Sequence, residues 1–376
     1  MRADPGDGAY LIRSLRNIED KPYDSMARLR LSATDDTGRE WTCGWTIPKV
    51  EVSNDDWEFR GTFDALCTSV ENTGRENGTQ LLFGMQRGHP AFTILSNVLW
   101  STDPAQRYTK TIQVLGSEIE VSLDPRSSTF SIAAPASEAL RPPFAENWIA
   151  EPLHILFGQF TYPRVTFRHT SDRSSHVWIR PTPGVLRGAQ WAALWAEVSD
   201  KTAQRFWDIY RSLLEFIASG NEFENHLITR LYHEIIQASD GSRWVWALTF
   251  ASAIEGLTSF LPDPPAESLI EDDPIASLQE YISKASSPKG LRDVANRALD
   301  RIREPTPRKK LKVLIEKGRI SAPHLKAWES LRNSVAHGSL QLPYSTEEED
   351  EKLLLLASLM HLLTLEIMSS RAAEQS

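Results

Sequence analysis

An arginine, an asparagine and a histidine stand close together near the end of this 376-residue chain, in the stretch WESLRNSVAHG (328–338). Four residues separate Arg332 from His337, and Asn333 lies between them. Histidine titrates near neutral pH, so it can accept or donate a proton there. Arginine is a permanent cation whose planar fork of donors suits phosphate oxygens, and asparagine can orient the imidazole or bind a substrate oxygen. Together these residue types predict acid–base chemistry on a phosphodiester.

RNA is the expected substrate, transfer RNA included, because its 2′-hydroxyl is a built-in nucleophile. No second histidine, cysteine or carboxylate stands near Arg332 and His337 at the spacing of metal ligands. We therefore expect chemistry that uses no metal ion and no other cofactor. The spacing also has an ordinary interpretation, since a histidine followed by a glycine, here Gly338, is a common way to end a helix.

A helix is expected to carry these residues. Large apolar side chains recur around them at spacings of three and four, the pattern of one buried helical stripe. The stripe consists of Leu325, Trp328, Leu331 and Val335. On a helical wheel, Asn333 and His337 share a face turned away from the stripe, and Arg332 lies at its edge. Asn333 and Ser334 are poor helix formers inside this helix, and such local inconsistencies concentrate at functional sites.

A second helix, expected over residues 243–261, contains a carboxylate that needs a partner. This segment is apolar on nearly all sides, so it should lie at the centre of a helical bundle. Glu255 stands in its middle, and a buried carboxylate requires a cation or several hydrogen bonds. We predict that Arg332 is this cation and that Glu255 holds its guanidinium in place. An exposed Glu255 at one edge of the helix is the alternative.

Two further sets of polar residues each allow two interpretations. Between residues 301 and 326 the chain is strongly basic, and it leads directly into the Arg332 helix. Such a run is ordinarily a solvated helix face, and beside the proposed site it would steer phosphates. Its substrate-binding candidates are Arg308, Lys309, Lys310 and Lys312. Upstream, His226, Arg230 and His233 form a polar stripe, which we interpret as a solvated face, with an RNA groove as the alternative.

The residues from about 40 to 180 predict antiparallel β-structure. Runs rich in β-branched and aromatic residues alternate with turn formers, and no convincing helix interrupts them. KTIQVLGSEIEVSL (110–123) is the best hairpin, with Gly-Ser at its centre. A further strand pair is expected in LHILFGQFTYPRVTFRH (153–169) and HVWIRP (176–181). Seven or more strands of this kind predict a sandwich or barrel-like domain, which we interpret as a recognition or sensor domain that answers to a trigger.

The period of the hydrophobic pattern changes at the Pro/Gly break RPTPG (180–184), which divides the chain in two. The fold class is therefore α+β in two parts: an antiparallel β-rich domain over residues 1–183 and an all-helical bundle over residues 184–376. In the second part, a period of 3.6 residues predicts the helices. They cover 190–219, 223–239, 243–261, 275–286, 289–303 and 307–317, followed by the Arg332 helix and a leucine-rich helix to about 370.

Composition favours a soluble, cytoplasmic protein. The net charge of −9 argues against broad electrostatic capture of nucleic acid and leaves room for a local basic patch. Cys43 and Cys67 form no metal or disulfide framework, so a reducing compartment is expected. The first residues are charged and lack the apolar core of a signal peptide. The longest apolar run, Leu353 to Met368, is interrupted by polar residues and short for a membrane span, so we expect no membrane.

LRNSVAHG (331–338) resembles the signature of the HEPN superfamily (higher eukaryotes and prokaryotes nucleotide-binding), whose ribonuclease members carry Arg, a polar residue, a short spacer and His. WALTFASAIEGLTSFL (246–261) looks like the apolar helix with an embedded Glu in the Apea-like branch of that superfamily. The resemblance covers roughly residues 190–370. It implies an all-helical domain, a homodimer that brings two motifs together, and roles in phage defence or as toxins.

These expectations combine into one hypothesis, a metal-independent endoribonuclease of the HEPN type. His337 would act as general base or acid, Arg332 would stabilise charge in the transition state, Asn333 would orient His337 or the phosphate, and Glu255 would brace Arg332. The resemblance implies 2′,3′-cyclic phosphate ends and antiphage defence by abortive infection. The alternatives are a non-catalytic HEPN scaffold for interactions or nucleotide binding, and a toxin that a separate antitoxin neutralises.

Overall fold

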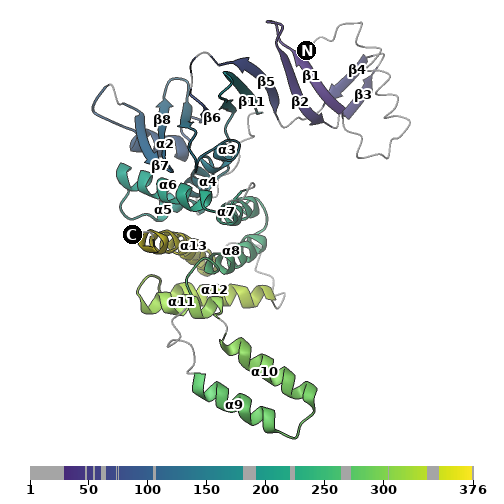
Figure 1. Ribbon diagram of the computed structural model, residues 1–376, viewed down its shortest axis with the longest axis vertical. Coiled ribbons are helices and arrows are strands. Elements are labelled where there is room, and N and C mark those ends of the chain that lie inside the picture. The colour runs from purple at the N-terminus through teal and green to yellow at the C-terminus, as the bar shows by residue number, and fades with distance from the viewer. Residues whose placement is uncertain are drawn as a thin grey trace. The chain divides into compact units, whose positions relative to one another are not determined.

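The computed structural model describes residues 29–46, 49–53, 56–60, 65–72, 74, 76–104, 107–180, 192–220, 225–263, 272–303, 305–336 and 347–374. The chain forms two compact units. The sheet unit comprises residues 1–86, 108–146 and 162–184, and the helical unit comprises residues 87–107, 147–161 and 185–376. As predicted, the fold is α+β, with an antiparallel sheet followed by a helical region (Figure 1). The boundary expected at 183/184 lies outside the described residues, and two earlier segments, 87–107 and 147–161, belong to the helical unit.

The sheet unit is built on a nine-stranded antiparallel sheet with the order β1-β2-β5-β11-β10-β6-β9-β8-β7. Its strands are β1 (Leu29–Thr34), β2 (Glu40–Thr46), β5 (Leu66–Glu71), β6 (Gly78–Gly84), β7 (Thr109–Val114), β8 (Ser117–Asp124), β9 (Thr129–Pro135), β10 (Val165–His169) and β11 (Ser174–Ile179). Strands β3 (Lys49–Ser53) and β4 (Asp56–Arg60) pair separately. In the described part of the chain the large sheet is open, with β1 and β7 at its edges, so the predicted sandwich or barrel is wrong. Alternation along a strand reports which residues are buried, and it does not report how a sheet closes.

The hairpin predicted at 110–123 is present as β7 and β8. Alternate residues of β8 are buried, from Ser117 to Leu123. The turn is Leu115-Gly116, one residue earlier than the predicted Gly-Ser centre, because Val114 pairs with Ser117. Both turn residues have positive φ angles, 52° and 70°. A two-residue turn of this kind matches the right-handed twist of the flanking strands.

Three helices interrupt the region that was expected to be free of them: α2 (Pro90–Val98), α3 (Phe144–Trp148) and α4 (Glu151–Phe157). Helix α4 occupies the first part of the strand expected at 153–169, of which only β10 is a strand. Every residue of α4 is buried. A short segment that is buried on all sides shows neither the two-residue nor the 3.6-residue period, so its sequence resembles that of a buried strand.

The helical unit follows the predicted segments closely. Its further helices are α5 (Leu194–Glu197), α6 (Ala203–Ala218), α7 (Leu227–Ala238), α8 (Arg243–Thr258), α9 (Asp272–Lys284), α10 (Lys289–Arg303), α11 (Pro307–Glu316), α12 (Ala322–Ala336) and α13 (Glu347–Glu374). The helix expected over 190–219 is divided, because Thr202 caps α6 by accepting a hydrogen bond from the amide of Arg205 (3.1 Å). Helix α8 is central, as predicted, and packs against α7, α12 and α13 (Figure 1).

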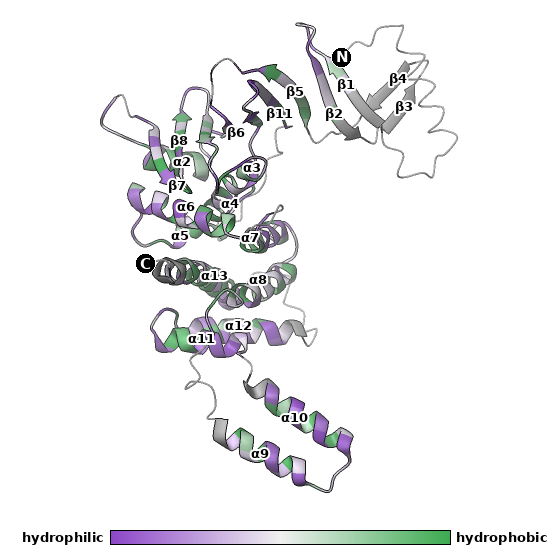
Figure 2. Cartoon of the chain, viewed as in Figure 1, coloured by the Kyte–Doolittle hydropathy of each residue, from purple (hydrophilic) through white to green (hydrophobic). Residues whose placement is uncertain are grey.

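Helix α13 contains a long apolar stretch. Its stretch Glu347–Ser370 is long and apolar enough to cross a membrane, and it is the one such stretch within the described residues. Leu353, Leu356 and Leu363 are fully buried, and the helix packs against α8 and α12. A position in the core of a bundle accounts for its hydrophobic composition (Figure 2) and is compatible with a soluble protein.

Candidate functional site

Glu255 is carried by helix α8, whose central position follows from its composition. Ser242 caps the start of α8 by accepting a hydrogen bond from the amide of Val245 (3.3 Å). Phe250, Ile254 and other apolar residues of α8 are buried on several sides of the helix. The Glu255 side chain is 36% exposed, so it lies at the edge of the buried surface. The carboxylate is therefore half-exposed, which is closer to the alternative of an exposed Glu255 at the helix edge than to full burial.

Helix α12 is anchored on α8 by Trp328. The Trp328 side chain is buried, and its indole N–H donates a hydrogen bond to the carbonyl of Ala251 (3.2 Å). Leu325 and Leu331 are buried beside it, as the predicted stripe requires. Arg332 follows Trp328 by one helical turn, and its guanidinium carbon lies 5.7 Å from the centre of the indole ring. That distance is within the range of a cation–π contact.

Arg332 and Glu255 form the predicted ion pair, in which Arg332 Nε donates a hydrogen bond to Glu255 Oε1. The two side chains are 53% and 36% exposed. A pair this exposed contributes at most about 1 kcal/mol to stability, so it matters more for orientation than for stability. Only one guanidinium donor is used in this bond, and the terminal amino groups make no other hydrogen bond within the described residues. They remain open to an anion from solvent.

The other two motif residues are described only in part. Asn333 is exposed next to Arg332. The hydroxyl of Ser334 donates to the carbonyl of Ser330 (2.9 Å), which is how a poor helix former is accommodated inside a helix. Helix α12 ends at Ala336, and His337 lies outside the described residues, as does the glycine after it. The structure therefore describes the Arg–Glu half of the candidate site, and the role of His337 stays a prediction.

The basic candidates on α11 have different surroundings. Arg308 Nε donates to Glu329 of α12 at 2.5 Å, which ties the two helices together. Lys312 is exposed, and Lys309 is half-buried. Because Arg308 already has a carboxylate partner, Lys312 is the candidate whose exposed cation best suits a phosphate that approaches from solvent.

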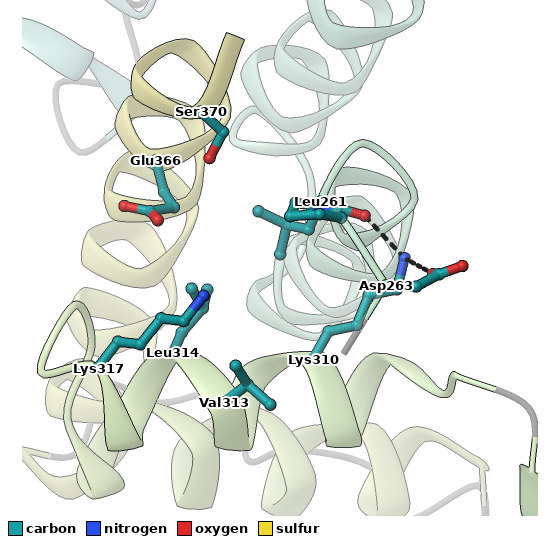
Figure 3. A pocket seen from close by; sticks show the side chains of 9 residues that line it. Leu261, Asp263, Lys310, Val313, Leu314, Lys317, Glu366 and Ser370 are labelled. Carbon is teal, nitrogen blue, oxygen red and sulfur yellow. Dashed lines mark hydrogen bonds and ion pairs between the residues drawn. The ribbon is translucent and has the colours of Figure 1, made fainter. Parts of the chain in front are cut away.

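Lys310 points into the bundle. Its side chain is 10% exposed, and its ammonium group donates to the carbonyl of Leu261 (2.9 Å) and pairs with Asp263 (3.0 Å). Figure 3 shows both contacts at one side of a small pocket of about 50 Å³, which is also lined by Lys317 and Glu366. The charge of Lys310 thus joins α11 to the turn after α8, and this geometry does not fit the expected substrate-binding role.

A buried chain of hydrogen bonds, which the sequence pattern does not predict, joins α4 to α7. Nδ1 of His154 lies 2.5 Å from Nε2 of His233. His154 Nε2 lies 2.9 Å from the Thr161 carbonyl, which can only accept, so this nitrogen carries the proton and Nδ1 is an acceptor. His233 Nε2 therefore donates to His154, and His233 Nδ1 accepts from the Asn225 amide (3.2 Å). The partners fix both tautomers.

Both imidazoles are held neutral. Burial, with His233 nearby, lowers the pKa of His154 to about 3, and burial lowers the pKa of His233 to about 4. His226, on the same helix face, is also buried, and its backbone N–H donates to Glu151 (3.1 Å). The interpretation of His226, Arg230 and His233 as a solvated face is therefore wrong for the two histidines. Because both histidines are buried, they cannot line an RNA groove either.

A second polar cluster joins α5, α12 and α13. Ser358 donates to Glu197 (2.9 Å), and His324 Nε2 lies 3.3 Å from the same hydroxyl. His324 Nδ1 accepts from the amide of Ser321 (3.1 Å), so Nε2 carries the proton and cannot take one from Ser358. The cluster is therefore no serine-nucleophile triad. His361, 4.0 Å from Glu197, and then Ser358 lower the pKa of the Glu197 carboxyl, against the effect of burial.

No three histidine, cysteine, aspartate or glutamate side chains in the described part of the chain are arranged to hold a metal ion. No protein-family model, no curated protein and no solved structure matches this chain. The HEPN resemblance therefore rests on the residues themselves and stays a prediction. What the geometry shows at the candidate site is the contact between Arg332 and Glu255.

Proposed function

We propose that this chain is a metal-independent endoribonuclease of the HEPN type. The observation that carries the proposal is the Arg332–Glu255 pair, in which a carboxylate of α8 orients an arginine of α12 at a half-exposed surface. The pair supports the proposal because phosphoryl transfer needs a cation that is both preoriented and accessible to the substrate. His337 stands five residues after Arg332 in the sequence and supplies the group that transfers a proton.

The reaction is an internal transfer within RNA. The 2′-hydroxyl loses its proton and its oxygen bonds to the neighbouring phosphorus, the bond from phosphorus to the 5′-oxygen breaks, and that oxygen takes up a proton. The products are a 2′,3′-cyclic phosphate and a 5′-hydroxyl. His337 accepts the first proton or donates the second. Arg332 stabilises the charge on the phosphorane-like transition state, and Asn333 orients the imidazole or the phosphate.

Glu255 is a positioning residue in this scheme, because it acts through Arg332. Its carboxylate engages Nε of Arg332, which leaves the terminal amino groups for two phosphate oxygens. The exposed Lys312 on α11 contributes to phosphate attraction. Lys310 has no part in substrate binding, because its ammonium group is held by Leu261 and Asp263.

The biological side of the proposal rests on the resemblance alone. It comprises a homodimer that brings two motifs together, a cytoplasmic location, and antiphage defence by abortive infection. The β-rich sheet unit then serves as the sensor of a trigger. In the rival function, a non-catalytic scaffold, Arg332 and Glu255 only join two helices at the surface. The amino groups of Arg332 are exposed and make no other hydrogen bond to the residues that the structure describes, which favours the nuclease over the scaffold.

The test is cleavage of total cellular RNA by the purified chain in an excess of EDTA. The variants are Arg332→Ala and His337→Ala, with Arg211→Ala as a matched control, because Arg211 is an exposed arginine of α6 in an ion pair with Asp208 (3.5 Å). We expect wild type and the control to leave 2′,3′-cyclic phosphate ends and the other two variants to leave RNA intact. Cleavage that EDTA abolishes, or that survives in His337→Ala, contradicts the mechanism. RNA left intact by all four proteins favours the scaffold.

A further inference from the structure

Helices α9 and α10 form an antiparallel hairpin whose two arms contact each other (Figure 1). The Gln279 amide donates to Asp300 (2.8 Å), and Arg292 donates to the carbonyl of Ser283 (2.8 Å). The side chains between the arms are buried or half-buried. They are Ile275, Gln279 and Ile282 of α9, and Ala295, Asn296 and Leu299 of α10.

A neighbouring face of the same hairpin exposes large apolar side chains. The exposed fractions are 46% for Leu278, 74% for Tyr281, 63% for Leu291 and 55% for Val294. On a helical wheel, these residues lie roughly a fifth to two fifths of a turn from the side where the arms touch. The offset has the same sign in both helices. Because the arms are antiparallel, all four side chains therefore lie on one face of the hairpin.

This face, called here the apolar face, consists of Leu278, Tyr281, Ala285, Leu291, Val294 and Ala298. On the same wheel, the charged side chains described in the hairpin fall elsewhere. They are Glu280, Lys284, Lys289, Arg292, Asp293, Arg297 and Asp300. A surface without cations does not suit RNA, whose binding depends on phosphate neutralisation. An uncharged face suits a two-fold interface, because no like charges meet across the axis.

On each arm of the apolar face the side chains change from large to small along the sequence. Because the arms are antiparallel, a large side chain on one arm lies level with a small one on the other. The contacts between the arms, Gln279 to Asp300 and Arg292 to Ser283, set Leu278 level with Ala298 and Ala285 level with Leu291. A two-fold axis parallel to the hairpin places α9 of one copy on α10 of the other at the same level. Leu278 then meets Ala298, Leu291 meets Ala285, and Tyr281 meets Val294. The face is complementary to itself in shape as well as in charge.

We propose that the apolar face is a homodimer interface, in which the hairpins of two copies of this chain form an antiparallel four-helix bundle. Burial of four large apolar side chains from each copy drives the association. The proposal assigns the homodimer of the proposed function to this surface and rests on that function for no more than this. It is argued from the hairpin alone, since neither Arg332 nor Glu255 belongs to the hairpin. A surface of the same chain or a different protein are the other occupants, and the test separates both from a second copy.

The first experiment is light scattering of the full chain across a concentration series. We expect a dimer for the wild type and a monomer for Leu278→Lys, which places two ammonium groups in the interface. Ala276→Lys adds the same charge to an exposed position on the opposite side of α9 and should remain dimeric. Leu278→Ala should raise the dissociation constant on the order of tenfold, because each dimer loses two leucine contacts. Circular dichroism checks that each variant is folded.

The second experiment tests the arrangement by oxidation. Leu278→Cys combined with Ala298→Cys should give a covalent dimer through the pairing of α9 with α10 of the other copy. Leu278→Cys combined with Ala276→Cys should not. A wild type that is monomeric at all concentrations, or a Leu278→Lys variant that remains dimeric, overturns the inference. A monomeric wild type would also remove the homodimer from the proposed function. RNA cleavage is measured in its own assay, so the nuclease activity fails or stands separately.

Discussion

Lowering the pH from 7 to 5 should destabilise the helical unit through two buried imidazoles. His154 and His233 are neutral in the folded chain, because burial lowers their pKa values to about 3 and about 4. An imidazole in the unfolded chain has a pKa of about 6.5. In this range the unfolded chain therefore binds protons that the folded chain does not bind. The contribution to stability is complete above about pH 7 and is lost as the pH falls below about 6.5.

The magnitude follows from the position of pH 5 between the folded and unfolded pKa values. It lies about 1.5 pH units below the ordinary imidazole pKa, and each pH unit is worth about 1.4 kcal/mol per proton. Each histidine should therefore lower the free energy of unfolding by about 2 kcal/mol at pH 5. Glu197 also has a lowered pKa, but carboxyl groups of the unfolded chain titrate near pH 4, so its contribution at pH 5 is small.

The assay is urea unfolding of the full chain at pH 7 and at pH 5, followed by circular dichroism of the helices. His233→Gln removes one titrating group and keeps an amide that can donate to Nδ1 of His154. The stability difference between wild type and His233→Gln should narrow by about 2 kcal/mol between the two pH values. His176→Gln, on strand β11 of the sheet unit, is the control and should leave helix unfolding unchanged. A difference of constant size at both pH values would refute the assignment of His233 as a buried neutral donor.

The candidate site and its supports give three more expected outcomes. Glu255→Gln should lower the initial rate of RNA cleavage about tenfold with an unchanged melting temperature, because the ion pair is exposed and orients Arg332; an unchanged rate contradicts the positioning role. Lys310→Met should lower the free energy of unfolding in urea by about 1–2 kcal/mol and leave KM for RNA unchanged. Lys312→Met should instead raise KM for RNA and leave the free energy of unfolding unchanged. If Lys310→Met raised KM and Lys312→Met did not, Lys310 would be the residue that binds substrate. Ser242→Ala should cost about 1 kcal/mol in urea unfolding by removing the cap of α8, and equal stability would show that the cap is unimportant.

Most of the fold could be predicted because hydrophobic periodicity reports burial directly. Strand β8 alternates between buried and exposed residues, and α6 and α7 bury one stripe each, so all three fall where the sequence predicts them. Helix α4 shows the limit of this approach, because a segment buried on every side has no period. The order of the strands in the sheet depends on pairings between distant segments, which no local pattern contains.

The same distinction between local patterns and distant contacts applies to the candidate site. A carboxylate inside an apolar helix predicts a cation as its partner, and Glu255 does pair with Arg332, although its side chain is half-exposed. The contact between His154 and His233 joins residues that are 79 positions apart. His154 lies in a segment whose pattern predicts a strand. The sequence therefore predicts no helix there that could carry a partner for His233. A run of basic residues, likewise, does not reveal that Lys310 turns inward while Lys312 stays in solvent.

The helices of the candidate site are held together by contacts around the ion pair, since the exposed pair itself contributes little to stability. Trp328 bonds α12 to α8 at Ala251, Arg308 bonds α11 to α12 at Glu329, and Lys310 bonds α11 to the turn after α8. Polar contacts thus join α12 to α8, α12 to α11, and α11 to the turn that follows α8. An exposed ion pair alone would let Arg332 move, and these contacts hold the helix that carries Arg332 against the helix that carries Glu255. Electrostatic stabilisation of a transition state depends on such prior orientation, since a donor that must reorganise during the reaction loses much of its effect.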